Sequence, residues 1–167
     1  MIRILASVCL LCMVAVHSHA GSSIDPVIVN LDEGSGTISI TNVSGEPMGY
    51  EVRALDWTTN NAGRDVTEDT DNLVVFPPIF RLNDGDTATL RLREVVPPQQ
   101  EENAYRLEIS EEPPEVSGGG IGFQMQYITS VFSSNRQARA SVTCEFVSAT
   151  TLRVKNSGNR RARIVEV

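Results

Sequence analysis

Residues 87–93 read Thr-Ala-Thr-Leu-Arg-Leu-Arg, so that Ala88, Leu90 and Leu92 share one side and polar residues share the other. This period of two is typical of a β-strand with one buried face. The same alternation returns along the chain, and no window of about a dozen residues spaces its apolar positions as a helix does. The sequence therefore predicts an all-β protein.

Six further stretches follow this pattern, and turn-forming Gly, Pro, Asn and Asp separate them. The expected strands cover residues 24–31, 37–43, 50–57, 73–76, 87–93, 105–109 and 121–132. The polar and acidic residues 58–72 are expected to form a loop. Seven strands in about a hundred residues predict a seven-stranded immunoglobulin-like β-sandwich.

Residues 1–20 have the features of a secretory signal peptide. Arg3 gives a basic start, residues 4–16 are apolar with one exception, and small residues precede the expected cleavage before Gly21. The apolar run is too short to span a bilayer, so we expect no membrane insertion after cleavage. Lipidation of Cys12 is the alternative, but no small residue stands just before it.

The expected mature chain, residues 21–167, contains no histidine and a single cysteine, Cys144. Ser-His-Asp and Cys-His nucleophilic sites need an imidazole, and zinc sites need several His or Cys ligands. The acidic residues between 58 and 72 do not spell a calcium-binding loop. We therefore expect no catalytic residue, no metal and no cofactor, and a protein that is not an enzyme.

Charge divides the chain into two parts. Residues 21–135 hold 19 acidic and 6 basic side chains, whereas residues 136–167 hold 2 acidic and 7 basic ones. An acidic body argues against binding of nucleic acid. We predict a domain at 21–135, a linker at 136–141 and a partial second β domain at 142–167. Only its first strands are expected, and exposed strand edges would favour self-association.

Several segments carry a resemblance to a known family. They are residues 24–31, Ile-Ser-Ile-Thr-Asn at 38–42, Trp57, Phe-Pro-Pro-Ile-Phe-Arg-Leu at 76–82, Leu-Arg-Leu at 90–92, Tyr-Arg-Leu at 105–107 and Glu-Glu-Pro-Pro at 111–114. In this order and spacing they resemble the periplasmic chaperones of the chaperone–usher pathway. The resemblance covers residues 22–135 and, weakly, the tail.

The resemblance implies a function. Members of the family bind pilus or fimbrial subunits that lack their last strand, lend them a strand of their own, and deliver them to an outer-membrane usher. The lent strand would be residues 121–127, with Ile121, Phe123, Met125 and Tyr127 entering the groove of the subunit. The alternative is that these four side chains face the core of their own domain.

The family also anchors the terminal carboxylate of its subunit with an arginine on the first strand and a lysine late in the last strand. The matching positions hold Ile28 and Ser130, which carry no charge. Arg91 and Arg136 are the candidate replacements, with Arg93 as a further arginine. Glu111 is expected to pair with an arginine across the domain junction, from its matching place in the family.

A second hypothesis is an exported immunoglobulin-like module with a structural or adhesive role and no pilin client. Such a module would work by ordinary packing. A neighbouring gene for an usher or a pilin would favour the chaperone.

Overall fold

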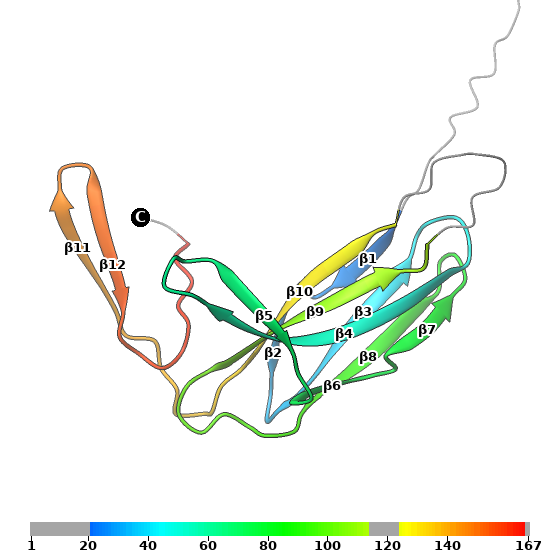
Figure 1. The fold of residues 1–167 in the computed structure, drawn as a ribbon, viewed down its shortest axis with the longest axis horizontal. Helices are drawn as coiled ribbons and strands as arrows, with labels where there is room; N and C mark the ends of the chain where they lie inside the picture. The colour runs from blue at the N-terminus through cyan, green and yellow to red at the C-terminus, as the bar shows by residue number, and fades with distance from the viewer. Residues whose placement is uncertain (1–20, 114–123, 166–167) are drawn as a thin grey trace, which may run out of the picture.

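The computed structural model describes residues 21–113 and 124–165. These ranges form twelve strands, and Figure 1 shows two layers of strands in one sandwich with a hairpin standing apart from it. In this part of the chain, no helix is long and apolar enough to cross a membrane. The predicted all-β, immunoglobulin-like architecture is confirmed.

The first layer is a four-stranded antiparallel sheet in the order β1-β3-β8-β6. Its strands are β1 (Ser22–Asp25), β3 (Ser35–Asn42), β8 (Thr87–Glu94) and β6 (Leu73–Phe76). Strand β8 lies in the middle because both of its edges are paired, and its inner side chains, Leu90 and Leu92, are almost fully buried. The alternation of apolar residues in 87–93 therefore arises because one face of this strand is buried, as expected.

The second layer is a six-stranded sheet in the order β2-β10-β9-β4-β5, with β7 also pairing with β4. Its strands are β2 (Ile28–Leu31), β10 (Gln126–Ser133), β9 (Asn103–Glu111), β4 (Met48–Thr59), β5 (Asp65–Asp69) and β7 (Ile79–Leu82). Strand β2 runs parallel to β10, and the other pairs are antiparallel.

The core lies between the two sheets and consists of their inward-facing side chains. Its buried apolar residues are Val29, Leu31, Ile38, Ile40, Tyr50, Val52, Leu73, Val75, Leu82, Leu90, Leu92, Tyr105, Leu107, Ile109 and Val131. Burial of each such side chain contributes about 1.5–3 kcal/mol. The strands that carry the candidate site pack on this core.

The predicted first strand, residues 24–31, divides into two. Strand β1 pairs with β3 in one sheet, whereas β2 pairs with β10 in the other. Pro26 lies between them, and proline has no N–H to donate to a sheet ladder. The chain therefore crosses from one layer to the other at this point.

The expectation that residues 58–72 form a loop is wrong in part. Strand β4 continues to Thr59, and β5 pairs with it along Asp65–Asp69. The side chains of β5 are mostly exposed, so no apolar alternation marks the strand. Arg53 and Arg106 form ion pairs with its acidic residues Asp69 and Asp65, which offset their negative charge.

Residues 142–156 form a sheet of their own. Strands β11 (Val142–Ser148) and β12 (Thr151–Asn156) make a two-stranded antiparallel sheet, and every residue of β11 is exposed. Residues 162–165, the last ones described, form no strand. An isolated hairpin of this kind has little stability of its own.

Candidate protein-binding site

One edge of β10 is open along its first half. The strand pairs with β9 from Gln126 to Ser133, but it pairs with β2 only from Ser130 onward. Strand β1 lies at the end of the other sheet and pairs only with β3 in the described part of the chain. Unpaired edges of this kind are templates for a strand from another protein.

The structure describes two of the four residues predicted to bind a subunit. Met125 is 45% exposed. Tyr127, two positions later, packs partly buried against the core and so points inward. Ile121 and Phe123 lie outside the described residues. Ile128, on the outer face of β10, is 58% exposed and adds an apolar side chain that the prediction did not include.

A buried polar cluster joins the start of β10 to the start of β1. Glu111 is 3% exposed, and its Oε1 accepts hydrogen bonds from Ser22 Oγ at 2.7 Å and from Tyr127 Oη at 3.1 Å. The backbone N–H of Ser22 donates to Tyr127 Oη at 2.8 Å. Tyr50 Oη lies 2.7 Å from Ser22 Oγ. Burial raises the pKa of both tyrosines above 10.0, and the charge of Glu111 adds to this effect.

The expected pairing of Glu111 with an arginine at the junction is wrong. Its carboxylate binds Ser22 and Tyr127, and it ends β9, whereas the junction lies near the beginning of that strand. Glu102 occupies the junction instead. Sequence reasoning missed Glu102 because nothing in its neighbourhood distinguishes it from the adjacent Glu101.

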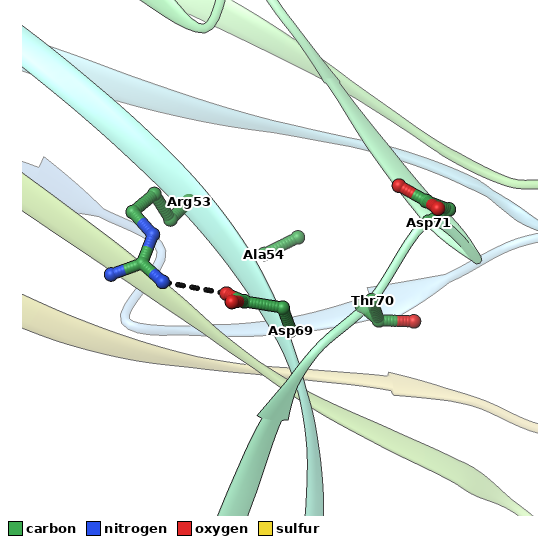
Figure 2. A pocket seen from close by; sticks show the side chains of 5 residues that line it. All are labelled: Arg53, Ala54, Asp69, Thr70 and Asp71. Carbon is green, nitrogen blue, oxygen red and sulfur yellow. Dashed lines mark hydrogen bonds and ion pairs between the residues drawn. The ribbon is translucent and has the colours of Figure 1, made fainter.

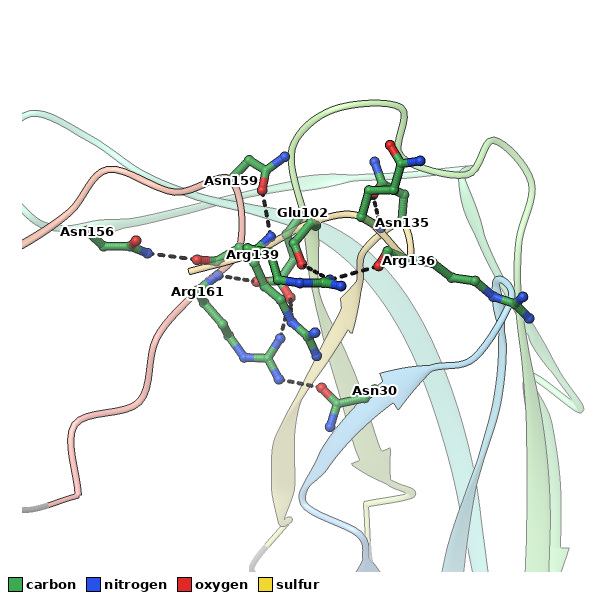
Figure 3. A network of polar contacts seen from close by, with 11 residues as sticks. Asn30, Glu102, Asn135, Arg136, Arg139, Asn156, Asn159 and Arg161 are labelled. Atoms are coloured by element: carbon green, nitrogen blue, oxygen red, sulfur yellow. Dashed lines mark hydrogen bonds and ion pairs between the residues drawn. The ribbon is translucent and has the colours of Figure 1, made fainter. Parts of the chain in front are cut away.

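Glu102 joins the tail to the sandwich (Figure 3). Its side chain is 7% exposed and accepts hydrogen bonds from the guanidinium of Arg161 at 2.5 Å and from the backbone N–H of Arg161 at 2.9 Å. Arg161 also donates to Asn30, and its guanidinium lies 3.6 Å from the centre of the Phe132 ring. The tail is therefore held at the outer face of the six-stranded sheet.

A second arginine lies on this same face. The guanidinium carbon of Arg106 is 3.6 Å from the centre of the Trp57 ring. Its Nη1 donates to Ser130 Oγ at 2.5 Å, and its Nη2 lies 3.0 Å from Asp65. Trp57 and Phe132 contact each other with ring centres 5.7 Å apart. Such stacking holds a guanidinium in place while leaving donors for a further ligand.

Trp57 carries an unused hydrogen-bond donor. Its Nε1 is buried, and no acceptor lies within reach among the described residues. A buried donor without a partner costs about 1–3 kcal/mol, and such groups often mark a functional site.

Arg106 lies next to one of the two positions at which the resemblance places the carboxylate anchor. Ile28 and Ser130 lie opposite each other in the β2–β10 pairing, and Arg106 lies opposite Ser130 on the other side. Arg91 belongs to β8 in the other sheet, and Arg136 pairs with Glu33. The structure brings neither of these two candidates to the Ile28–Ser130 pair, because sheet pairing, not sequence distance, decides which arginine lies there.

A shallow hollow of about 310 Å³ lies beside β4 and the end of β5 (Figure 2). Arg53, Ala54, Asp69, Thr70 and Asp71 line it, and Arg53 pairs with Asp69 at 2.6 Å. The hydrogen bond that Arg53 donates to Asp69 raises the pKa of the guanidinium. The hollow is exposed and acidic, and we assign it no role.

Comparison with known proteins identifies the family of this chain and structures with a similar fold. Residues 24–133 match the family model described as pili and flagellar-assembly chaperone, PapD N-terminal domain. No curated protein matches the chain in sequence. Among solved structures, the class 5 fimbriae chaperone CfaA superposes with a TM-score of 0.68 at 19% identity, covering 83% of this chain and 68% of that one.

Two further structures have the same fold. The CsuC–CsuE chaperone–tip subunit complex of Acinetobacter baumannii gives a TM-score of 0.65 at 19% identity, covering 84% of this chain and 78% of that one. The CupB2 chaperone of Pseudomonas aeruginosa gives 0.58 at 20% identity, covering 85% and 70%. These superpositions show that the chain shares their fold.

Proposed function

The chain belongs to the pili and flagellar-assembly chaperones, a family of chaperones and not of enzymes, and we propose that it binds pilus subunits by lending them a strand. It would act in the periplasm and deliver its client to an outer-membrane usher. The strand lent would be the segment that ends in the open half of β10, with Ile121, Phe123 and Met125 as the residues that enter the subunit.

The observation that carries this proposal is the open edge of β10. Its backbone from Gln126 to Thr129 has no strand partner on the side of β2 among the described residues. A subunit that lacks a strand offers unpaired backbone groups and an apolar groove, which such an edge complements. Met125 and Ile128 supply exposed apolar side chains next to it.

Tyr127 has a different part in this arrangement. Its ring packs against the core of the sandwich, and its hydroxyl binds Glu111. We therefore propose that Tyr127 holds the lent strand to the chaperone, while the residues before it contact the client.

The anchor for the terminal carboxylate of the subunit would be Arg106. Its guanidinium lies beside Ser130, at the position where the family carries its cations, and it stacks on the ring of Trp57. A carboxylate bound there would displace Asp65 from an exposed ion pair, which costs little.

The strand and the anchor would contribute different amounts to the free energy of binding. Each apolar side chain that becomes buried contributes about 2 kcal/mol, whereas one charge-assisted hydrogen bond contributes about 1.5–3 kcal/mol. Three or four side chains therefore dominate the affinity. The anchor mainly fixes the register of the subunit along the strand.

Co-expression with each pilus subunit encoded in the same genome tests the proposal. The tagged chain should co-purify with one of these subunits as a complex of one copy each. The double change Phe123→Asp and Met125→Asp should abolish the complex, because charged side chains cannot enter an apolar groove.

Val74→Asp is the matched control, because Val74 is 50% exposed but lies on β6 of the other sheet. It should leave the complex intact. Failure of the wild-type chain to bind any of these subunits would instead favour an exported structural or adhesive module. Full binding by the double variant would contradict the strand assignment.

A further inference from the structure

Two buried clusters with the same chemistry lie at opposite ends of the sandwich. At one end, Glu94 is 1% exposed and accepts a hydrogen bond from Tyr105 Oη at 2.7 Å. At the other end, Glu111 accepts one from Tyr127 Oη at 3.1 Å. In both clusters a tyrosine hydroxyl donates to a buried carboxylate. Both clusters join the two sheets, since Glu94 also accepts from Ser133 of β10, but they lie at different edges.

Only the Glu111 cluster bridges the two open edges. Ser22 lies on β1 and Tyr127 lies on β10, which belong to different sheets. Ser22 donates to Tyr127 through its backbone N–H and to Glu111 through its hydroxyl. The first residue of β1 and the beginning of β10 are therefore tied together through one carboxylate.

The backbone of Glu111 holds the same segment from the other side. Its N–H donates to Met125 O at 3.0 Å, and its carbonyl accepts from Gln124 Nε2 at 2.8 Å. Glu111 therefore contacts Gln124, Met125 and Tyr127 at once. It lies where β10 begins.

The fit around Tyr127 Oη extends to Gly21. This residue is buried and has a φ of +105°, a conformation that favours glycine. A Cβ at this position would lie 2.6 Å from Tyr127 Oη, which is closer than atoms in contact. The hydroxyl therefore occupies a space that only glycine leaves free.

We propose that Glu111 is a positioning residue for strand donation, because it holds Tyr127 against Ser22 and so fixes the open edges of β10 and β1 relative to each other. The inference rests on the proposed function, since the spacing of the edges matters only if a client strand enters there. A client strand needs its partner about 4.8 Å away to form a ladder. If the edge of β10 were not held in place at Met125, the first backbone hydrogen bond of this ladder would be lost.

Tyr127→Phe tests this with little risk to folding, because the ring remains and only the hydroxyl is lost. Tyr105→Phe is the matched control, since it removes the equivalent bond to Glu94 at the other end. Amide hydrogen exchange of the free protein is measured at Ser22 and Glu111. In Tyr127→Phe, exchange at both amides should become about tenfold faster, as for loss of a bond to a charged group.

Tyr105→Phe should leave exchange at these two amides unchanged. Ser22→Ala, which removes one donor to Glu111 at the end of the sandwich, should accelerate exchange at Glu111 as well. Tyr127→Phe should also slow association with the pilus subunit that the wild-type chain binds, about tenfold relative to Tyr105→Phe. Together these results would support a positioning role.

Two outcomes would overturn the inference alone. One is unchanged exchange at Ser22 and Glu111 in Tyr127→Phe. The other is faster exchange together with subunit association equal to that of Tyr105→Phe, which would leave Glu111 with a purely structural role. Absence of subunit binding by the wild-type chain would overturn the proposed function itself, and it is recognised without any variant.

Discussion

Arg106 of β9 and Ser130 of β10 lie opposite each other, and the guanidinium donates a hydrogen bond of 2.5 Å to the hydroxyl. Ile28 of β2 lies on the far side of Ser130. The three residues therefore lie in a row across three strands, with Ser130 between Arg106 and Ile28. This cation belongs to β9, which lies next to β10, and it is the one that we propose as the carboxylate anchor.

Removal of this cation should weaken binding of a pilus subunit. We expect Arg106→Ala to raise the dissociation constant about 10- to 100-fold, since one charge-assisted bond is lost. Titration followed by the fluorescence of Trp57, the single tryptophan, measures this. Arg53→Ala is the control, because Arg53 is 52% exposed and pairs with Asp69. An equal loss in both variants would contradict the anchor.

Replacement of Glu94 should destabilise the sandwich. Its carboxylate accepts hydrogen bonds from Tyr105, Asn103 and Ser133 and is almost fully buried. Glu94→Gln would place an amide donor against these donors, so we expect a loss of about 1–3 kcal/mol in urea unfolding. Asp69→Asn should cost less than about 1 kcal/mol, because its ion pair is exposed. Similar losses would contradict this account.

Stability should fall at alkaline pH. Burial raises the pKa of all three tyrosines, Tyr50, Tyr105 and Tyr127, above 10.0. Above pH 10.0 the folded chain therefore holds protons that the unfolded chain has released, so stability is complete below this pH and is lost as the pH rises through the folded pKa values. Ultraviolet absorbance of phenolate measures the titration. Titration of the folded protein at pH 10.0 would contradict it.

Loss of Arg161 should release the tail from the sandwich. Glu102 would keep a nearly buried carboxylate without its main partner, and Phe132 would lose its stacked guanidinium. We expect Arg161→Ala to speed proteolysis after Arg160 and Arg163 several-fold, as for a segment with weaker local structure. Arg153→Ala, on exposed β12, is the control. Unchanged cleavage would show that other contacts hold the tail.

Local pattern was sufficient for much of the fold. The alternation in 87–93 and 105–109 predicts β8 and β9, because each strand has one buried face. It was insufficient for β5, whose side chains are mostly exposed and show no such period. The transfer of the chain to the second sheet at Pro26 is not predicted by the strand pattern of residues 24–31.

The sequence by itself determined the class of fold, the exclusion of histidine-based chemistry from residues 21–167, and the segments that resemble the chaperones. Only the tertiary structure decided which polar side chains meet. Arg106 reaches Ser130, Arg161 reaches Glu102 and Ser22 reaches Glu111 across 24, 59 and 89 positions of sequence. Such contacts follow from strand order and register, which are set by the packing of the whole core and not by any local pattern.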